Sequence, residues 1–140
     1  MTHKKTNILQ DDDGAVAVEF VLVLPLLLSM VFGIICFGQY FAIANSLQQL
    51  AAEAARYSAL GITSEEREAL ALSFVANTNE RFSFLGPDKI TPSISTLSED
   101  VPDAIVVSLS YDLTGSAVDV ASGFLGFEFD VLTRRSYLAY

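Results

Sequence analysis

The residue whose type and place point most directly to chemistry is Glu19. It lies between Val18 and Phe20, at the start of a long apolar stretch, and Gly14 precedes it by five residues. A carboxylate at the centre of a membrane helix costs about 2.5–3.5 kcal/mol on insertion scales, and less near the interface. We therefore expect Glu19 either to pair with a positively charged group or to extend toward the lipid headgroups.

The residues on which most enzymes depend are scarce. The only histidine is His3 and the only cysteine is Cys36, and both lie outside the part of the chain that could fold as a soluble domain. This inventory excludes a zinc cluster, a disulfide framework and a histidine-based triad. The acidic residues also lack the spacing of a calcium loop. We therefore expect no catalytic residues, no metal and no cofactor, and the protein is predicted not to be an enzyme.

Composition and charge restrict the class of protein further. The chain has 140 residues, of which 51% are hydrophobic, and its mean hydropathy is +0.43. These values favour one membrane segment joined to one short domain. The formal net charge of −9 argues against a nucleic-acid partner, which would need a basic patch.

The apolar residues concentrate in one segment. From Phe20 to Ala52, 33 residues include no Asp, Glu, Lys or Arg. A bilayer core needs about 20 predominantly apolar residues as helix, so this segment can span a membrane in contact with lipid. Lys4 and Lys5 precede it and Arg56 follows it, which predicts a cytoplasmic amino terminus and an extracytoplasmic remainder. Cys36 is expected to be a small buried hydrophobic residue of the span.

A lipoprotein modified at Cys36 is one alternative for this segment, but Ile35 stands where such a processing site has a small residue. A cleaved secretory signal is the other alternative. Ala42-Ile43-Ala44 has the small residues of a signal-peptidase site. However, a signal core runs for about 7–15 residues and the whole signal for about 15–30, and both would be exceeded here. The length favours a retained span.

The residues from Gly14 to Leu28 resemble a known pattern. The segment from Gly14 to Phe20 looks like the prepilin peptidase site of the Flp pilus class. It consists of a glycine, four apolar residues, a glutamate and an aromatic residue. Val18 to Leu28, with Pro25 in the apolar run, resembles the signature of the TadE-like family of minor pilins, or pseudopilins, of the tight-adherence system. The acidic run at 11–13 departs from most leaders of this class.

The resemblance implies a specific processing event and specific partners. Residues 1–14 would be a leader that a prepilin peptidase removes after Gly14, so that Ala15 becomes the new amino terminus. Glu19 and Phe20 would serve peptidase recognition and subunit assembly, with the Glu19 carboxylate neutralising the Ala15 ammonium of its own or a neighbouring subunit. The implied partners are the prepilin peptidase, the major Flp pilin, other minor pilins and an assembly platform of the bacterial inner membrane.

The remaining pattern predicts an α+β fold with a long amino-terminal helix and a small extracytoplasmic head. The helix is expected over residues 15–60, with a kink at Pro25 and an end at Gly61. Beyond the span it carries an apolar stripe formed by Ile43, Leu47, Leu50, Ala54 and Tyr57. This stripe could pack against the head of the same chain, against helices of other pilins, or against both along different parts.

The head is expected over residues 61–140. Thr63 and Glu66 form a capping box that begins a second helix reaching to about Arg81. The buried side of that helix is predicted to comprise Ala69, Leu70, Leu72, Phe74 and Ala76. Alternation then predicts a roughly three-stranded antiparallel sheet, with an edge strand around Pro92, a second strand over 105–113 and a third over 127–132. A loop is expected over 114–123.

Two function classes follow from the sequence. One is a minor pilin or pseudopilin that acts in assembly of a Flp-type adherence pilus. The other is an uncleaved single-pass membrane protein whose outward head binds another envelope protein or a ligand. The segment from Gly14 to Phe20 separates them, because a plain membrane anchor has no need of Glu19.

Overall fold

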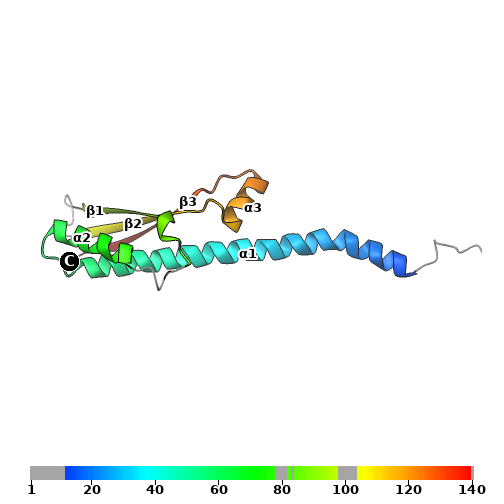
Figure 1. The fold of residues 1–140 in the computed structure, drawn as a ribbon, viewed down its shortest axis with the longest axis horizontal. Coiled ribbons are helices and arrows are strands. Elements are labelled where there is room, and N and C mark those ends of the chain that lie inside the picture. Colours follow the sequence, from blue (N-terminus) through cyan, green and yellow to red (C-terminus); the bar gives the residue numbers. More distant parts are fainter. Residues whose placement is uncertain (1–11, 78–81, 83, 98–103, 140) are drawn as a thin grey trace, which may run out of the picture. The chain divides into compact units, whose positions relative to one another are not determined.

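A computed structural model describes residues 12–77, 82, 84–97 and 104–139, and they form an α+β fold, as predicted (Figure 1). The elements in chain order are α1 (Asp12–Ser58), α2 (Ser64–Asn77), the short 3₁₀ helix η2 (Pro87–Lys89), β1 (Ile90–Leu97), β2 (Ala104–Asp112), α3 (Ala117–Leu125) and β3 (Val131–Leu138). The chain divides into two compact units, residues 1–35 and residues 36–140, and each is described by itself.

The first unit contains the amino-terminal part of α1. This helix begins at Asp12 rather than at the predicted Ala15, and the leader residues 1–11 lie outside the described residues. Its side chains are apolar and mostly exposed, among them Phe20, Leu22 and Leu26. Within the described part of the chain, α1 alone is long and apolar enough to cross a membrane. The expectation of a single-pass membrane protein rests on this helix.

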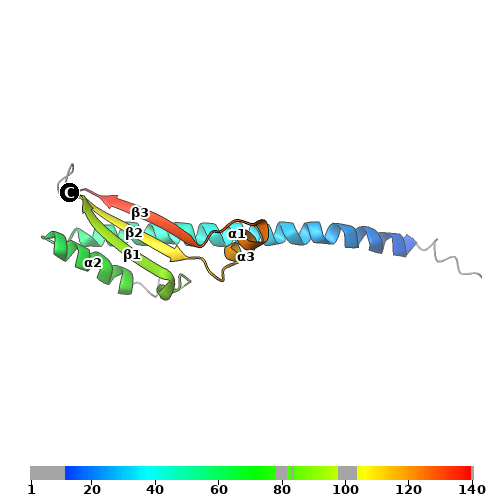
Figure 2. The same ribbon diagram turned by 90° about the horizontal axis from the view of Figure 1, so that it is seen from above.

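The second unit contains a three-stranded antiparallel sheet in the order β1-β2-β3 (Figure 2). In β2, Ile105, Val107 and Leu109 are fully buried and Ser108 and Ser110 are less so, as the predicted alternation requires. Val106, which was expected on the other face, is also buried, so the alternation does not hold at that residue. Pro92 pairs with Leu109 and lies in β1, which among the described strands has only β2 as a neighbour. The prediction of an edge strand at Pro92 is confirmed, because a proline cannot donate a ladder hydrogen bond and is tolerated at an edge.

The hydrophobic core of this unit joins one face of the sheet to the helices. The stripe residues Ile43, Leu47, Leu50 and Ala54 are buried in the same cluster as Val107, Leu109 and Leu113. The prediction that the stripe packs on the head of its own chain is therefore confirmed for these four residues. Tyr57, the fifth stripe residue, is instead 40% exposed, and its ring contacts that of Phe74 in α2 with centroids 5.2 Å apart.

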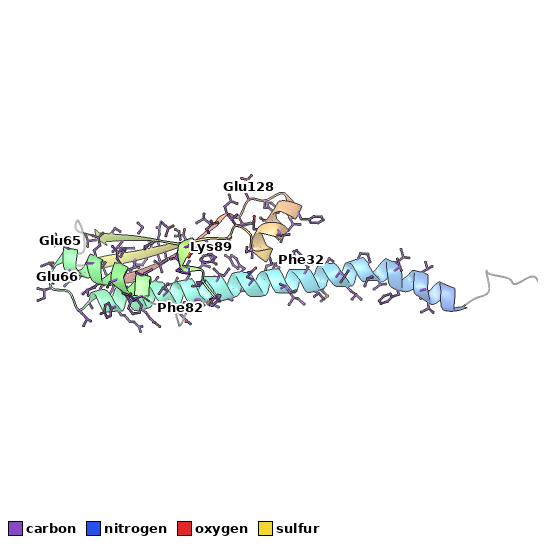
Figure 3. All side chains as sticks on the ribbon, in the orientation of Figure 1. Phe32, Glu65, Glu66, Phe82, Lys89 and Glu128 are labelled. Carbon is purple, nitrogen blue, oxygen red and sulfur yellow. The ribbon has the colours of Figure 1, made fainter. Side chains whose placement is uncertain are left out.

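A capping box turns the chain from α1 into α2, as predicted. The N–H of Glu66 donates to Thr63 Oγ1 at 3.2 Å, while the Glu66 carboxylate accepts from the backbone of Thr63 at 3.4 Å and of Ile62 at 3.0 Å. Glu66 therefore lies at the start of α2 (Figure 3). A Cβ at Gly61 would lie only 2.8 Å from the backbone nitrogen of Arg67, so this corner requires glycine. These local contacts set the direction in which α2 returns along the head.

The buried side of α2 differs from the prediction. Ala71 is the buried residue of this helix, and Leu70 and Phe74 are half-buried beside it. Ala69, Leu72 and Ala76 are exposed, which contradicts their predicted burial. Only a narrow apolar stripe of α2 packs against the core. The prediction instead assigned apolar residues from a wider face of the helix to the buried side. The predicted end near Arg81 lies outside the described residues.

Two further predictions for the head were wrong. Residues 114–123 do not form a continuous loop, because α3 begins at Ala117 with Ser116 as its N-cap. The third strand is Val131–Leu138 and not 127–132, so the alternating residues Phe127 and Phe129 precede the strand and are exposed. The alternation there reflects an exposed connection with apolar side chains rather than a buried strand face.

Candidate processing and assembly segment

Gly14 and Ala15, the predicted processing site, lie in the first turn of α1 and are exposed. No atom lies within 4 Å of the position that a Cβ at Gly14 would take. The first four N–H groups of a helix have no acceptor within that helix. The peptide bond between Gly14 and Ala15 is therefore accessible and lies where the backbone is least constrained by helical hydrogen bonds.

Glu19 lies one helical turn after Ala15 on the same side of α1, because residues four apart on a helix are neighbours. Its side chain is exposed, as is the ring of Phe20. Among the described residues, none forms an ion pair or hydrogen bond with the Glu19 carboxylate. The carboxylate is thus available to a positive group at the start of this helix or on another chain.

Pro25 lies inside α1, and the helix continues through it. A proline within a helix has no N–H to donate to the fourth residue before it, and its ring crowds that carbonyl. One turn later, the Ser29 hydroxyl donates to the Leu26 carbonyl at 2.8 Å. The predicted kink at Pro25 stays a prediction.

A contact that the sequence did not predict holds the start of α3 against α1. The N–H of Ala117 donates to Gln39 Oε1 at 2.8 Å, and the Cys36 thiol donates to the Ala117 carbonyl at 3.2 Å. Cys36 is only 8% exposed, and it belongs to the unit of residues 36–140. It was correctly expected to be buried, but the head covers it. The only sequence signal was Gln39, a polar residue directly after the apolar run.

The acidic residues near the end of β2 serve the local backbone. Asp112 accepts hydrogen bonds from the hydroxyl of Thr114 at 2.5 Å and from its N–H at 2.9 Å, and these bonds lower the pKa of the carboxyl. Asp119 accepts from the N–H of Gly115 at 2.8 Å. Within the described ranges, no three His, Cys, Asp or Glu side chains are grouped so that they could hold a metal ion.

Comparison with known proteins identifies the amino-terminal segment. Residues 14–56 match the model of a family described as TadE-like protein, and this family is associated with the tight-adherence pilus system. The resemblance inferred from Gly14, Glu19 and Pro25 is therefore confirmed. No curated protein and no solved structure matched the chain.

Proposed function

We propose that this chain, which matches the TadE-like family, is a minor pilin or pseudopilin. A prepilin peptidase would cut it after Gly14, and the processed protein would act in assembly of a Flp-type adherence pilus. The observation that carries the proposal is the extent of the family match, which begins at Gly14 itself and covers Glu19, Phe20 and the apolar helix. Exposure of Gly14 and Ala15 supports access by a peptidase.

Cleavage would change the chemistry at the start of α1. Ala15 would gain an ammonium group, one turn before the exposed carboxylate of Glu19. Both groups border apolar residues such as Val16 and Val18, where the attraction between opposite charges is much stronger than in water. The pair would form within one subunit or between a subunit and its neighbour. If the Glu19 carboxylate of one subunit paired with the Ala15 ammonium of another, this ion pair would form only when the subunits assemble.

The apolar first unit is suited to two environments in succession. Before assembly it would lie in the inner membrane, with the amino terminus cytoplasmic and the head extracytoplasmic. In assembly its exposed apolar side chains would pack against the helices of the major pilin and other minor pilins. The head contributes its own core to the fold, so that residues 36–140 keep their structure while the surroundings of the first unit change.

The test is the amino-terminal sequence of the protein extracted from the membranes of its own host. We expect a chain that begins at Ala15 and contains residues 15–140. The matched control is the same host without its prepilin peptidase, in which the chain should retain residues 1–14. An intact Met1 in the presence of the active peptidase would overturn the proposal and leave the uncleaved single-pass membrane protein as the explanation.

A further inference from the structure

The second unit carries an apolar patch that its own core does not cover. The patch comprises Val120, Phe124 and Leu125 of α3, Phe127 and Phe129 of the connection, and Val131 at the start of β3. Phe124 is 91% exposed, and each of the other five is more than half exposed. These six exposed apolar side chains fall within residues 120–131, and such a concentration favours contact with another apolar phase or partner.

Several polar groups at the two ends of α3 are satisfied by local hydrogen bonds. The Ser116 hydroxyl accepts from the N–H of Asp119 at 3.2 Å, and the Asp119 carboxylate accepts from the N–H of Gly115 at 2.8 Å. At the other end, Gly126 has a left-handed conformation with φ of 74°, and the N–H of Phe127 donates to the Ser122 carbonyl at 2.9 Å. These caps reduce the number of unsatisfied backbone groups that α3 would carry into apolar surroundings.

The attachment of α3 determines its level along α1. Gln39 and Cys36 bind the first residue of α3 through the hydrogen bonds described above. A bilayer core takes about 20 helical residues, so a span that starts at Phe20 ends near Gln39. Tyr40 follows directly, and tyrosine is enriched at the boundary between membrane and water. The start of α3 therefore lies at the level where α1 leaves the apolar part of the bilayer.

We propose that the apolar patch inserts into the lipid bilayer, so that α3 forms a shallow membrane contact in addition to the spanning helix. Lipid is favoured as the occupant because the hydrogen bonds of Gln39 and Cys36 hold the start of α3 at the end of the apolar run of α1. Phe37 and Phe41, which are close to these two residues in the chain, are also apolar and exposed. Glu128 and Asp130 alternate with the aromatic residues of the connection and remain among the headgroups. Glu128 lies in the connection, on the side away from α1 (Figure 3).

The experiment uses the absence of tryptophan from the sequence. The full-length protein with Phe124→Trp is reconstituted in phosphatidylcholine vesicles, and quenching is measured with lipids brominated on the acyl chain and with iodide on both sides of the bilayer. The matched control is Tyr137→Trp, because Tyr137 is an exposed aromatic residue in β3, outside the patch. We expect the Phe124→Trp emission to shift to shorter wavelength, to lose most of its intensity with brominated lipid and to resist iodide. The control should show the reverse.

Two results would overturn the proposal. Equal quenching of both variants by iodide, with no effect of brominated lipid, would show that the patch lies in water. Protection of the Phe124→Trp emission from both quenchers would show that protein covers the patch, and loss of that protection at a lower protein-to-lipid ratio would identify a second copy as the cover. The measurement does not depend on cleavage after Gly14, so its outcome is separate from that of amino-terminal sequencing.

Discussion

Gly14 allows the most direct test at the scale of single residues. The exposed backbone at this position has open space where a side chain would begin, so Gly14→Val is compatible with the helix and with the apolar span. A bulky side chain next to the Gly14 carbonyl would, however, obstruct the catalytic groups of a peptidase. We expect Gly14→Val to accumulate in the membrane as the uncut precursor, which mass spectrometry of the extracted protein would detect.

Gly33→Val is the matched control for this change. Gly33 lies in the same helix, and a Cβ there would also meet no atom within 4 Å. This variant should be cut as efficiently as the unmodified chain. If Gly14→Val has the same amino terminus as the unmodified chain, Gly14 is an ordinary helix residue and the processing proposal loses its main support.

Glu19 can be tested separately from cleavage. We expect Glu19→Ala to insert, because the apolar span is unchanged. It should be largely processed, because Gly14 and Ala15 at the cut are kept although Glu19 belongs to the recognised segment. Assembly should fail, since the Ala15 ammonium would remain in apolar surroundings without an opposite charge. The measurement is the number of pili per cell by electron microscopy, together with the amino-terminal sequence. Glu68→Ala, which removes an exposed carboxylate of α2, is the control, and normal piliation of Glu19→Ala would contradict the prediction.

Features set by short-range chemistry could be predicted at this scale. The capping box of Thr63 and Glu66 involves residues three apart, so their spacing alone determines the hydrogen bonds. Gly14, Glu19 and Pro25 formed a pattern specific enough to predict the family whose model matches residues 14–56. The partner of Glu19 could not be derived in the same way, because the charge that the carboxylate needs is not among the described side chains of this chain.

At the scale of elements, the region after β2 shows why local patterns mislead. Residues 114–123 contain glycine and serine, which favour a loop, yet Ser116 caps α3 and Gly126 ends it. The alternation at 127–131 resembled a strand face, whereas the actual strand β3 contains Arg134 and Arg135. As an edge strand with one face exposed, β3 tolerates charged residues that a buried strand would not. Its position is set by pairing with β2, which a local pattern does not contain.

The contact between α3 and α1 predicts a measurable protection of Cys36. The thiol is nearly buried and is the only one in the sequence, so a change in its rate of alkylation by a maleimide between variants reports on this contact. Gln39→Ala would leave the N–H of Ala117 without its acceptor and loosen the start of α3. We expect Cys36 of the unmodified protein to react slowly in detergent solution and that of Gln39→Ala to react severalfold faster.

Gln48→Ala provides the control for that experiment. Gln48 also donates from its side chain to a backbone group, the Arg135 carbonyl at 3.1 Å, but this bond lies at β3 and not at α3. Its loss should leave the alkylation rate of Cys36 unchanged. Fast alkylation of the unmodified protein, or equal rates for both variants, would show that α3 does not cover the thiol.

At the scale of the whole molecule, one helix contributes to two units with different requirements. The apolar side chains of residues 14–35 are mostly exposed, whereas the stripe that continues beyond them is buried in the head. Stability of the head should therefore depend on stripe residues and not on the apolar residues of the first unit. The change from uniform hydropathy to a periodic stripe was visible in the sequence because the two environments impose different patterns.

Two leucines of α1 test this division. Leu47 is fully buried in the head core, and Leu47→Ala should lower the free energy of unfolding of the head by about 2–5 kcal/mol. Leu27→Ala, in the exposed part of the helix, should leave it unchanged. All five tyrosines lie within residues 36–140, so near-ultraviolet circular dichroism of the detergent-solubilised protein during denaturation follows this unit. If both variants lowered the free energy of unfolding of the head equally, the separation of α1 into an exposed part and a part buried in the head would be contradicted.

The proline of β1 has a consequence for how the protein avoids aggregation. A protein with many exposed apolar side chains is prone to aggregate if an edge strand of its sheet can also pair with a strand from another molecule. Pro92 lies on such a margin and offers no N–H to an incoming strand. Continuous addition of a strand along β1 is therefore interrupted at this residue. Heads that are close together at the same membrane are thus hindered from joining their sheets through β1.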